Sequence, residues 1–117
     1  MLTAVKVSPP DDTAVLDRAQ LARMTYGDRN LERELLELFD RQAAMLVERM
    51  RGGTVTTIRP LAHTLKGSAS GIGAADVARA AEAAEQAPAE DCSAAVDRLA
   101  QAVVEARALI AELLRAG

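Results

Sequence analysis

Aromatic side chains make up only 2% of this 117-residue chain, although half of its residues are hydrophobic. A core that cannot rely on rings must be built from leucine, isoleucine, valine, methionine and the abundant alanine. Alanine has the highest helix propensity of all residues. No segment alternates polar and apolar residues over the length of a strand, whereas several segments repeat apolar residues at helical spacing. The sequence therefore predicts an all-α fold, and its length indicates a single domain.

Charge and cysteine content exclude several classes of protein. The net charge is -3, and residues of both signs are interspersed. Without a basic stripe or stacking aromatics, nucleic acid is not an expected partner. No stretch approaches the ~18 apolar residues of a membrane span, and the N-terminus lacks a signal-peptide pattern. Cys92 has no second cysteine in the chain to pair with, so an oxidising compartment is not indicated. Together with the lack of a signal-peptide pattern and of a membrane span, this predicts a cytoplasmic protein that does not associate with membranes.

The N-terminal part of the chain predicts a lead-in followed by a short helix. Residues 1–12 contain two prolines and no periodic pattern, so we expect a flexible segment there and a domain over residues 13–117. Asp17 and Gln20 have the spacing of a capping box, which predicts a helix over residues 18–26. We expect Tyr26 to pack at the junction that follows this helix.

Four longer helices follow, delimited by glycines, prolines and cap residues. Because Pro60 lies inside the third helix of the chain, that helix begins either near Thr57 or near Thr54 with a bend at Pro60, and we favour the second option. Short linkers favour antiparallel neighbours. We therefore expect an antiparallel up-and-down four-helix bundle with the short N-terminal helix packed across one end. The expected boundaries are Asp28 and Gly52 for the second helix, Gly71 and Gly73 for the end of the third, Pro88 after the fourth, and Asp91 as the cap of the fifth.

His63, the only histidine, is the first candidate for a functional residue. At ~100° per residue it points roughly 140° away from the apolar stripe of its helix. Arg59, Lys66, Gly67 and Ser70 share this outer face. A lone histidine is most often an incidental residue, but a phosphoryl group on imidazole needs nearby cations and room. The flanking residues offer both, so they favour a phosphoryl site.

The residues around His63 resemble a known family. Residues 63–69 read His-Thr-Leu-Lys-Gly-Ser-Ala, and residues 72–74 read Ile-Gly-Ala. This resembles the signature of the histidine phosphotransfer (HPt) domain, which is His-x-Leu-Lys-Gly-x-(Ala/Ser) followed by an aliphatic-Gly pair. Similar residues outside the signature include Glu85, and the resemblance covers roughly residues 14–115.

The resemblance implies a phosphorelay. His63 would accept a phosphoryl group from the aspartyl phosphate of one response-regulator receiver domain and pass it to the aspartate of another. In the family the accepting atom is usually the ring nitrogen farther from the backbone. Lys66 would be the neutralising cation and Gly67 the gap through which the receiver approaches. Arg59 and Ser70 come from helical geometry and not from the signature, so we expect Lys66 to contribute more to transfer than Arg59.

The same resemblance implies the partners and cofactors. Receiver domains and a hybrid histidine kinase would be the partners, and the receiver would supply Mg²⁺, so the chain would need no cofactor of its own. It has no ATP-binding loop, so we expect no kinase activity from it alone. One histidine and one cysteine far apart in sequence cannot form a closed zinc site.

Two other functions are also consistent with the sequence. The chain could be a helical adaptor that binds receivers without accepting phosphate, or the phosphoacceptor module of a larger histidine kinase. The start at Met1 and the lack of a kinase segment favour a free-standing protein.

Gln42 lies in the apolar stripe of the second helix, which predicts a buried amide that could help to orient the third helix. We expect a monomer, because the helices bury their apolar stripes within one bundle.

Overall fold

The computed structural model describes residues 12–116. Within this range the chain forms six α-helices and one short 3-10 turn, and no strand. The prediction of an all-α fold is confirmed. The elements are α1 Asp12–Val15, α2 Arg18–Met24, α3 Arg29–Met50, α4 Val55–Ile72, α5 Ala75–Gln86, the 3-10 turn η1 Ala89–Asp91, and α6 Cys92–Ala116.

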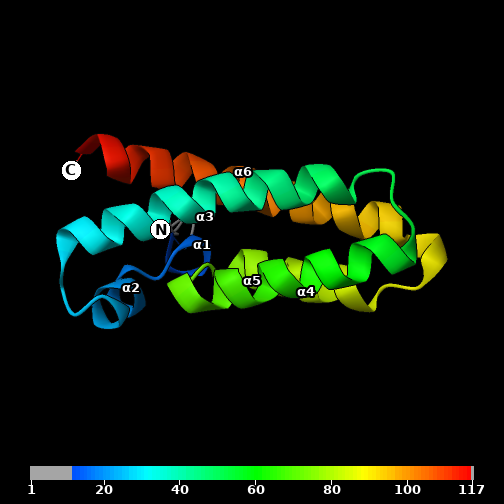
Figure 1. Ribbon diagram of the computed structural model, residues 1–117, viewed down its shortest axis with the longest axis horizontal. Helices are drawn as coiled ribbons and strands as arrows, with labels where there is room; N and C mark the ends of the chain where they lie inside the picture. Colours follow the sequence, from blue (N-terminus) through cyan, green and yellow to red (C-terminus); the bar gives the residue numbers. More distant parts are fainter. Residues whose placement is uncertain (1–11, 117) are drawn as a thin grey trace, which may run out of the picture.

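The four longest helices lie side by side along the long axis of the molecule (Figure 1). Helix α3 packs against α4 and α6, and α5 packs against the same two helices, so each of the four has two neighbours. In Figure 1 the chain runs from left to right in α3, returns in α4, and repeats this course in α5 and α6. The short helices lie at the end where α4 stops: α1 contacts α5 and α6, and α2 contacts α4.

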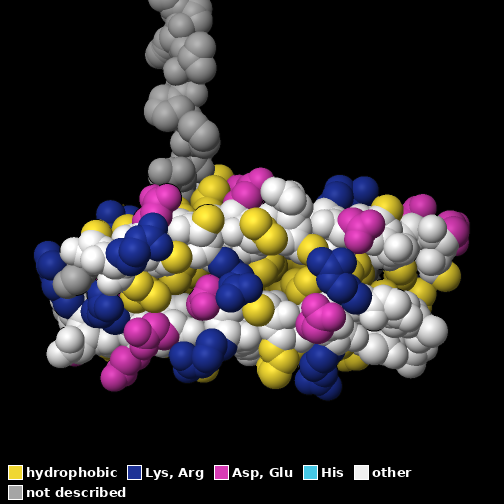
Figure 2. Space-filling model, turned by 90° about the horizontal axis from the view of Figure 1, so that it is seen from above, with side chains coloured by type: hydrophobic (Ala, Val, Ile, Leu, Met, Phe, Trp, Pro, Cys, Tyr) yellow, Lys and Arg dark blue, Asp and Glu magenta, His cyan; other side chains and the backbone are white. Residues whose placement is uncertain are grey.

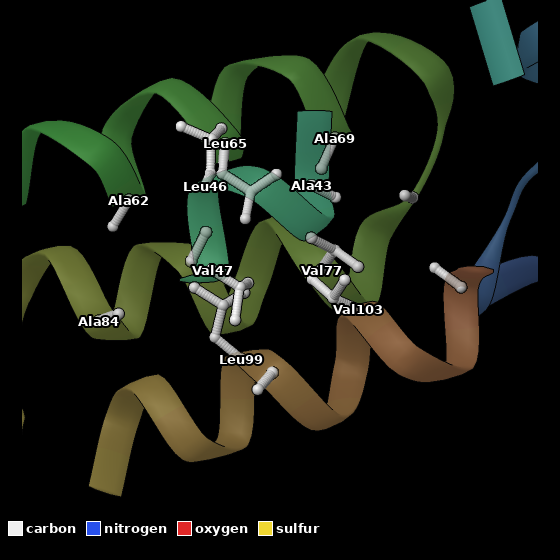
Figure 3. Packing of buried hydrophobic residues seen from close by; sticks show 14 of the residues in the cluster. Ala43, Leu46, Val47, Ala62, Leu65, Ala69, Val77, Ala84, Leu99 and Val103 are labelled. Atoms are coloured by element: carbon white, nitrogen blue, oxygen red, sulfur yellow. The ribbon is translucent and has the colours of Figure 1, made fainter. Parts of the chain in front are cut away.

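Alanine brings α4 and α5 close together. Ala62 and Ala69 of α4 and Val77, Ala81 and Ala84 of α5 are fully buried. Figure 3 shows Ala62 and Ala84 between the two helices, where a larger side chain would hold them apart. Interiors pack at the density of organic crystals, so small side chains on facing helices shorten the distance between the helix axes. The exposed flank of α5 consequently lies beside that of α4.

Two predicted helix caps are confirmed. The Asp17 carboxylate accepts a hydrogen bond from the Gln20 backbone N–H at 3.1 Å, and Asp28 accepts one from the Leu31 N–H at 3.1 Å. The capping box at Asp17 is only half formed. The Gln20 side chain donates instead to the Ser70 carbonyl oxygen at 2.7 Å, and so ties α2 to the last turn of α4.

Helix α4 begins after Thr54 and continues through Pro60. The longer of its two predicted versions is therefore confirmed, and the bend at Pro60 stays a prediction. The expectation that both Gly71 and Gly73 end this helix is wrong for Gly71, which lies within it. Gly73 ends the helix in the left-handed conformation with φ 87, which glycine adopts without strain.

The N-terminal part differs from the expectation in three ways. The first predicted helix ends at Met24, and an unpredicted turn, α1, precedes it. Tyr26 is 94% exposed with φ 54, so the expected packing role of this residue is wrong. The flexible segment was expected over residues 1–12: residues 1–11 lie outside the described residues, and Asp12 already begins α1.

The described part of the chain has no membrane-spanning helix, and its face in Figure 2 has no basic stripe. No helix there combines the length and the hydropathy needed to cross a bilayer. Figure 2 looks onto the side of the molecule formed by α3 and α6, where acidic, basic and apolar side chains are interspersed. This face offers no continuous positive stripe for a nucleic acid backbone.

Candidate functional site

His63 lies on the exposed face of α4. The buried side of this helix is formed by apolar residues that are at most 5% exposed, and the histidine side chain is 67% exposed. The position predicted from the helical period is therefore confirmed. The buried residues of α4 are Ile58, Ala62, Leu65, Ala69 and Ile72.

A carboxylate from the neighbouring helix bridges two of the candidate residues. Glu85, near the end of α5, places Oε2 2.8 Å from His63 Nδ1 and Oε1 3.0 Å from Lys66 Nζ. The Glu85 and Lys66 side chains are 24% and 29% exposed, so this ion pair is partly shielded from water. Oε1 is covered from solvent, and its contact with Lys66 has the distance of an ion pair without the angles of a regular hydrogen bond. The structure thus brings His63, Lys66 and Glu85 together.

The charge of Glu85 decides which nitrogen of His63 is free. The adjacent Lys66 lowers the pKa of Glu85 most, partial burial opposes this, and His63 adds to the lowering. Glu85 is therefore an ionised carboxylate at neutral pH, and an ionised carboxylate can only accept hydrogen bonds. It follows that His63 Nδ1 carries the hydrogen of this contact. In the neutral ring the lone pair then belongs to Nε2, the nitrogen that the contact with Glu85 leaves free.

Arg59 lies one turn before His63 on α4 but makes a different contact. Its Nη2 donates a hydrogen bond of 3.3 Å to the carbonyl oxygen of Ala87, the residue that follows α5. An open hollow of about 810 Å³ lies between these helices beside the imidazole. It is lined by Arg59, Pro60, His63, Thr64, Lys66, Glu85 and Gln86.

Gly67 and Ser70 lie on the same exposed face. A Cβ atom placed on Gly67 would meet no atom within 4 Å, apart from the helix's own nearby backbone, so the space above this residue is open. Ser70 is exposed, and its carbonyl oxygen holds the Gln20 side chain described above. The clearance expected at Gly67 is present, and the observed contact of Ser70 runs toward α2.

Gln42 does not fit the expectation of a buried amide. It lies on α3 and is half-buried, and no hydrogen bond joins its side chain to another described residue. The helical period placed Gln42 in the apolar stripe of its helix, but the buried residues of α3 do not include it. Nothing in the described contacts connects Gln42 with α4.

Glu85 is the residue that sequence reasoning did not assign to the site. The sequence placed it next to the small-residue face of its helix, one position after Ala84, and the family resemblance included it. Neither signal says that its carboxylate meets His63, because helical periodicity identifies a face and not the neighbour that this face meets. Such a pairing needs the relative register of α4 and α5.

The described residues contain no group of three or more histidine, cysteine, aspartate or glutamate side chains that could hold a metal ion. Cys92 is buried at the start of α6, with Sγ 3.8 Å from the Ala87 carbonyl oxygen. The site itself contains the His63 imidazole, the cations Arg59 and Lys66, and the Glu85 carboxylate.

Comparison with known proteins identifies the family. A family model described as the Hpt domain matches residues 34–115, which is well over half of the chain and includes α4, α5 and all four of His63, Lys66, Gly67 and Glu85. No match was found among curated proteins or among solved structures. The exposed histidine, which Glu85 of α5 contacts, is consistent with this match. The chain therefore belongs to the Hpt domain family, whose members take part in phosphorelay histidine phosphotransfer.

Proposed function

We propose that this domain is a phosphorelay intermediate in which His63 accepts a phosphoryl group from the aspartyl phosphate of one receiver domain and passes it to the aspartate of another. The observation that carries the proposal is the contact of 2.8 Å between Glu85 and His63 Nδ1. It fixes the hydrogen on Nδ1 and leaves the Nε2 lone pair available on a ring that is 67% exposed. A nucleophile must present a lone pair to the reacting atom, and this arrangement does so.

The transfer step can be written on these atoms. The Nε2 lone pair attacks phosphorus, the bond between phosphorus and the receiver's aspartyl oxygen breaks, and the carboxylate leaves with the electron pair. The Nδ1 hydrogen stays on the ring, and the Glu85 carboxylate stabilises the positive charge that develops there. Transfer to the second receiver reverses these steps. The receiver domain would supply Mg²⁺, and the chain itself would need neither a cofactor nor ATP.

Lys66 and Gly67 complete the proposed site. Lys66 holds Glu85 at 3.0 Å and keeps this carboxylate ionised beside the histidine. Gly67, with open space above it, would let the receiver's active site descend onto Nε2. A side chain at this position would stand one turn from the imidazole on the same face of the helix.

The proposed setting is a cytoplasmic monomer with an antiparallel up-and-down four-helix bundle, which receives phosphate from a hybrid histidine kinase through receiver domains. The direction of the four long helices in Figure 1 and their pairwise contacts support this bundle. Sedimentation at micromolar concentration tests the oligomeric state, and a stable dimer would contradict it.

Transfer from a receiver tests the function. A panel of receiver domains is labelled with a radioactive small-molecule phosphodonor, freed of donor, and mixed with the wild-type domain or with His63→Gln. We expect label to move from at least one receiver to the wild-type domain and not to His63→Gln. Binding of receivers to both proteins with no label on either would instead favour the adaptor reading.

A further inference from the structure

The hollow beside His63 is flanked by two cations whose present contacts differ. Lys66 Nζ lies 3.0 Å from the Glu85 carboxylate, so its charge is already matched by an opposite charge. Arg59 Nη2 donates to the neutral carbonyl oxygen of Ala87 at 3.3 Å, beyond the usual length of an N–H···O hydrogen bond. Neither Arg59 nor the carbonyl it holds faces a carboxylate in the described contacts. Arg59 is thus the cation with an unmatched charge.

A phosphoryl group on Nε2 would bring a charge of about -1.5 to -2 into this hollow. For Lys66 to turn toward it, Lys66 would have to leave Glu85, whose Oε1 is covered from solvent. Removing the partner of a covered carboxylate is costly. Arg59 would lose only a long hydrogen bond to a neutral acceptor. Charge-assisted bonds from a guanidinium to a phosphoryl group are stronger than that and can be bidentate.

The position of Arg59 allows the exchange. Residues four apart on a helix lie on one face with Cβ atoms about 5–6 Å apart, and Arg59 precedes His63 by four positions. Both residues line the same open hollow, and Arg59 is exposed. The Ala87 carbonyl oxygen would keep a weak donor, because Cys92 Sγ lies 3.8 Å from it.

We propose that Arg59 exchanges the Ala87 carbonyl oxygen for the phosphoryl group of phosphorylated His63 and is its main neutralising cation, while Lys66 remains with Glu85 as a positioning residue. This rests on the proposed function of His63. It reverses the order expected from the sequence, which ranked Lys66 above Arg59. Phosphorylation would then break the hydrogen bond that joins Arg59 of α4 to Ala87, the residue that follows α5.

The titration of the phosphoryl group measures which cation lies beside it. The domain is phosphorylated with phosphoramidate, in which Nε2 attacks phosphorus and ammonia leaves, and the ³¹P chemical shift is followed against pH. A neighbouring cation favours the dianionic phosphoryl group and lowers the midpoint of its second ionisation. The variants are Arg59→Ala, Arg59→Lys and Lys66→Ala. Arg79→Ala is the matched control, because this exposed arginine of α5 pairs with Asp76 and does not line the hollow.

We expect Arg59→Ala to raise the midpoint by about half a pH unit, the effect of one unit charge at ~6 Å in water. Arg59→Lys should recover part of this shift, Lys66→Ala should shift the midpoint by less than half as much, and Arg79→Ala should leave it unchanged. An unchanged midpoint in Arg59→Ala, or a larger shift in Lys66→Ala, would overturn the inference and leave the function of His63 standing. If the wild-type domain gave no phosphohistidine signal, or His63→Gln gave the same signal, the proposed function would fail and this inference with it.

Discussion

Glu85 Oε2 lies 2.8 Å from His63 Nδ1, although the two residues are 22 positions apart and belong to different helices. The contact gives an otherwise exposed imidazole a fixed orientation and a fixed hydrogen. It exists because the alanines on the facing sides of α4 and α5 let the flanks of these helices meet. Packing in the core of the domain thereby sets the chemistry at its surface.

The first prediction concerns this contact. Glu85→Ala removes the acceptor, so the ring can rotate and its hydrogen is no longer held on Nδ1, whereas Glu85→Gln keeps a neutral acceptor there. One hydrogen bond contributes about 0.5–1.5 kcal/mol, so we expect Glu85→Ala to slow labelling by phosphoramidate about 2- to 10-fold. Glu85→Gln should lose less. Rates equal to wild type in both variants would show that Glu85 does not prepare the nucleophile.

The second prediction concerns pH and stability. The pKa of Glu85 in the folded domain is lowered from its ordinary 4.5, chiefly by Lys66. The ion pair therefore stabilises the fold above pH 4.5, and this contribution is lost as the pH falls through the lowered pKa. Urea unfolding of wild type and Glu85→Gln should give a larger stability difference near neutral pH than in acid. A difference that grows on acidification would contradict the direction of the shift.

The third prediction concerns Gly67. Alanine is about 1 kcal/mol better than glycine inside a helix, and nothing beyond the helix's own nearby backbone lies within 4 Å of the new Cβ. Gly67→Ala should therefore stabilise the domain by up to that amount in thermal unfolding. Gly67→Leu should also fold. It should block transfer from receiver domains but still allow labelling of His63 by phosphoramidate, which needs no docking surface. Normal transfer from receivers to Gly67→Leu would refute the clearance argument.

The fourth prediction concerns Gly73, where replacing glycine with alanine should destabilise the domain instead of stabilising it. Gly73 has φ 87, and a Cβ there would lie 2.9 Å from the backbone oxygen of Asp17. Gly73→Ala should therefore destabilise the domain by more than about 1 kcal/mol, through strain and through loosening of the Asp17 N–H bond to the Gly73 carbonyl oxygen. Thermal unfolding beside Gly67→Ala provides the comparison. Equal melting temperatures in the two variants would contradict the account of both glycines.

The sequence predicted what depends on local signals. Capping residues such as Asp17 and Asp28 identified where helices begin, and the helical period put His63 on the exposed face of α4. The fold class followed from a core with almost no aromatic side chains. Each of these depends on interactions within a few residues along the chain or on composition, so one sequence carries the information.

Other features depend on how the helices meet and could not be read this way. The contact between Glu85 and His63 depends on the register of α5 against α4. The different partners of Lys66 and Arg59 depend on it as well. Gln20 has the spacing to complete a capping box, but a carbonyl at the end of α4 takes its side chain. Gln42 is half-buried although the helical period placed it in the apolar stripe, because the period does not say how much of that stripe the neighbouring helices cover. In all of these cases a tertiary neighbour decided between locally equivalent options.

The identity of the phosphorylated atom tests the central claim most directly. The domain is incubated with phosphoramidate, and the modified residue is located by mass spectrometry together with the acid and base stability of the label. We expect a label on His63 that is lost in acid and kept in base. The label should be absent from His63→Gln. The free energy of unfolding of this variant should lie within about 0.5 kcal/mol of the wild-type value, because the side chain is exposed. An acid-stable label on Thr64, Ser68 or Ser70, or a label that persists in folded His63→Gln, would contradict the account.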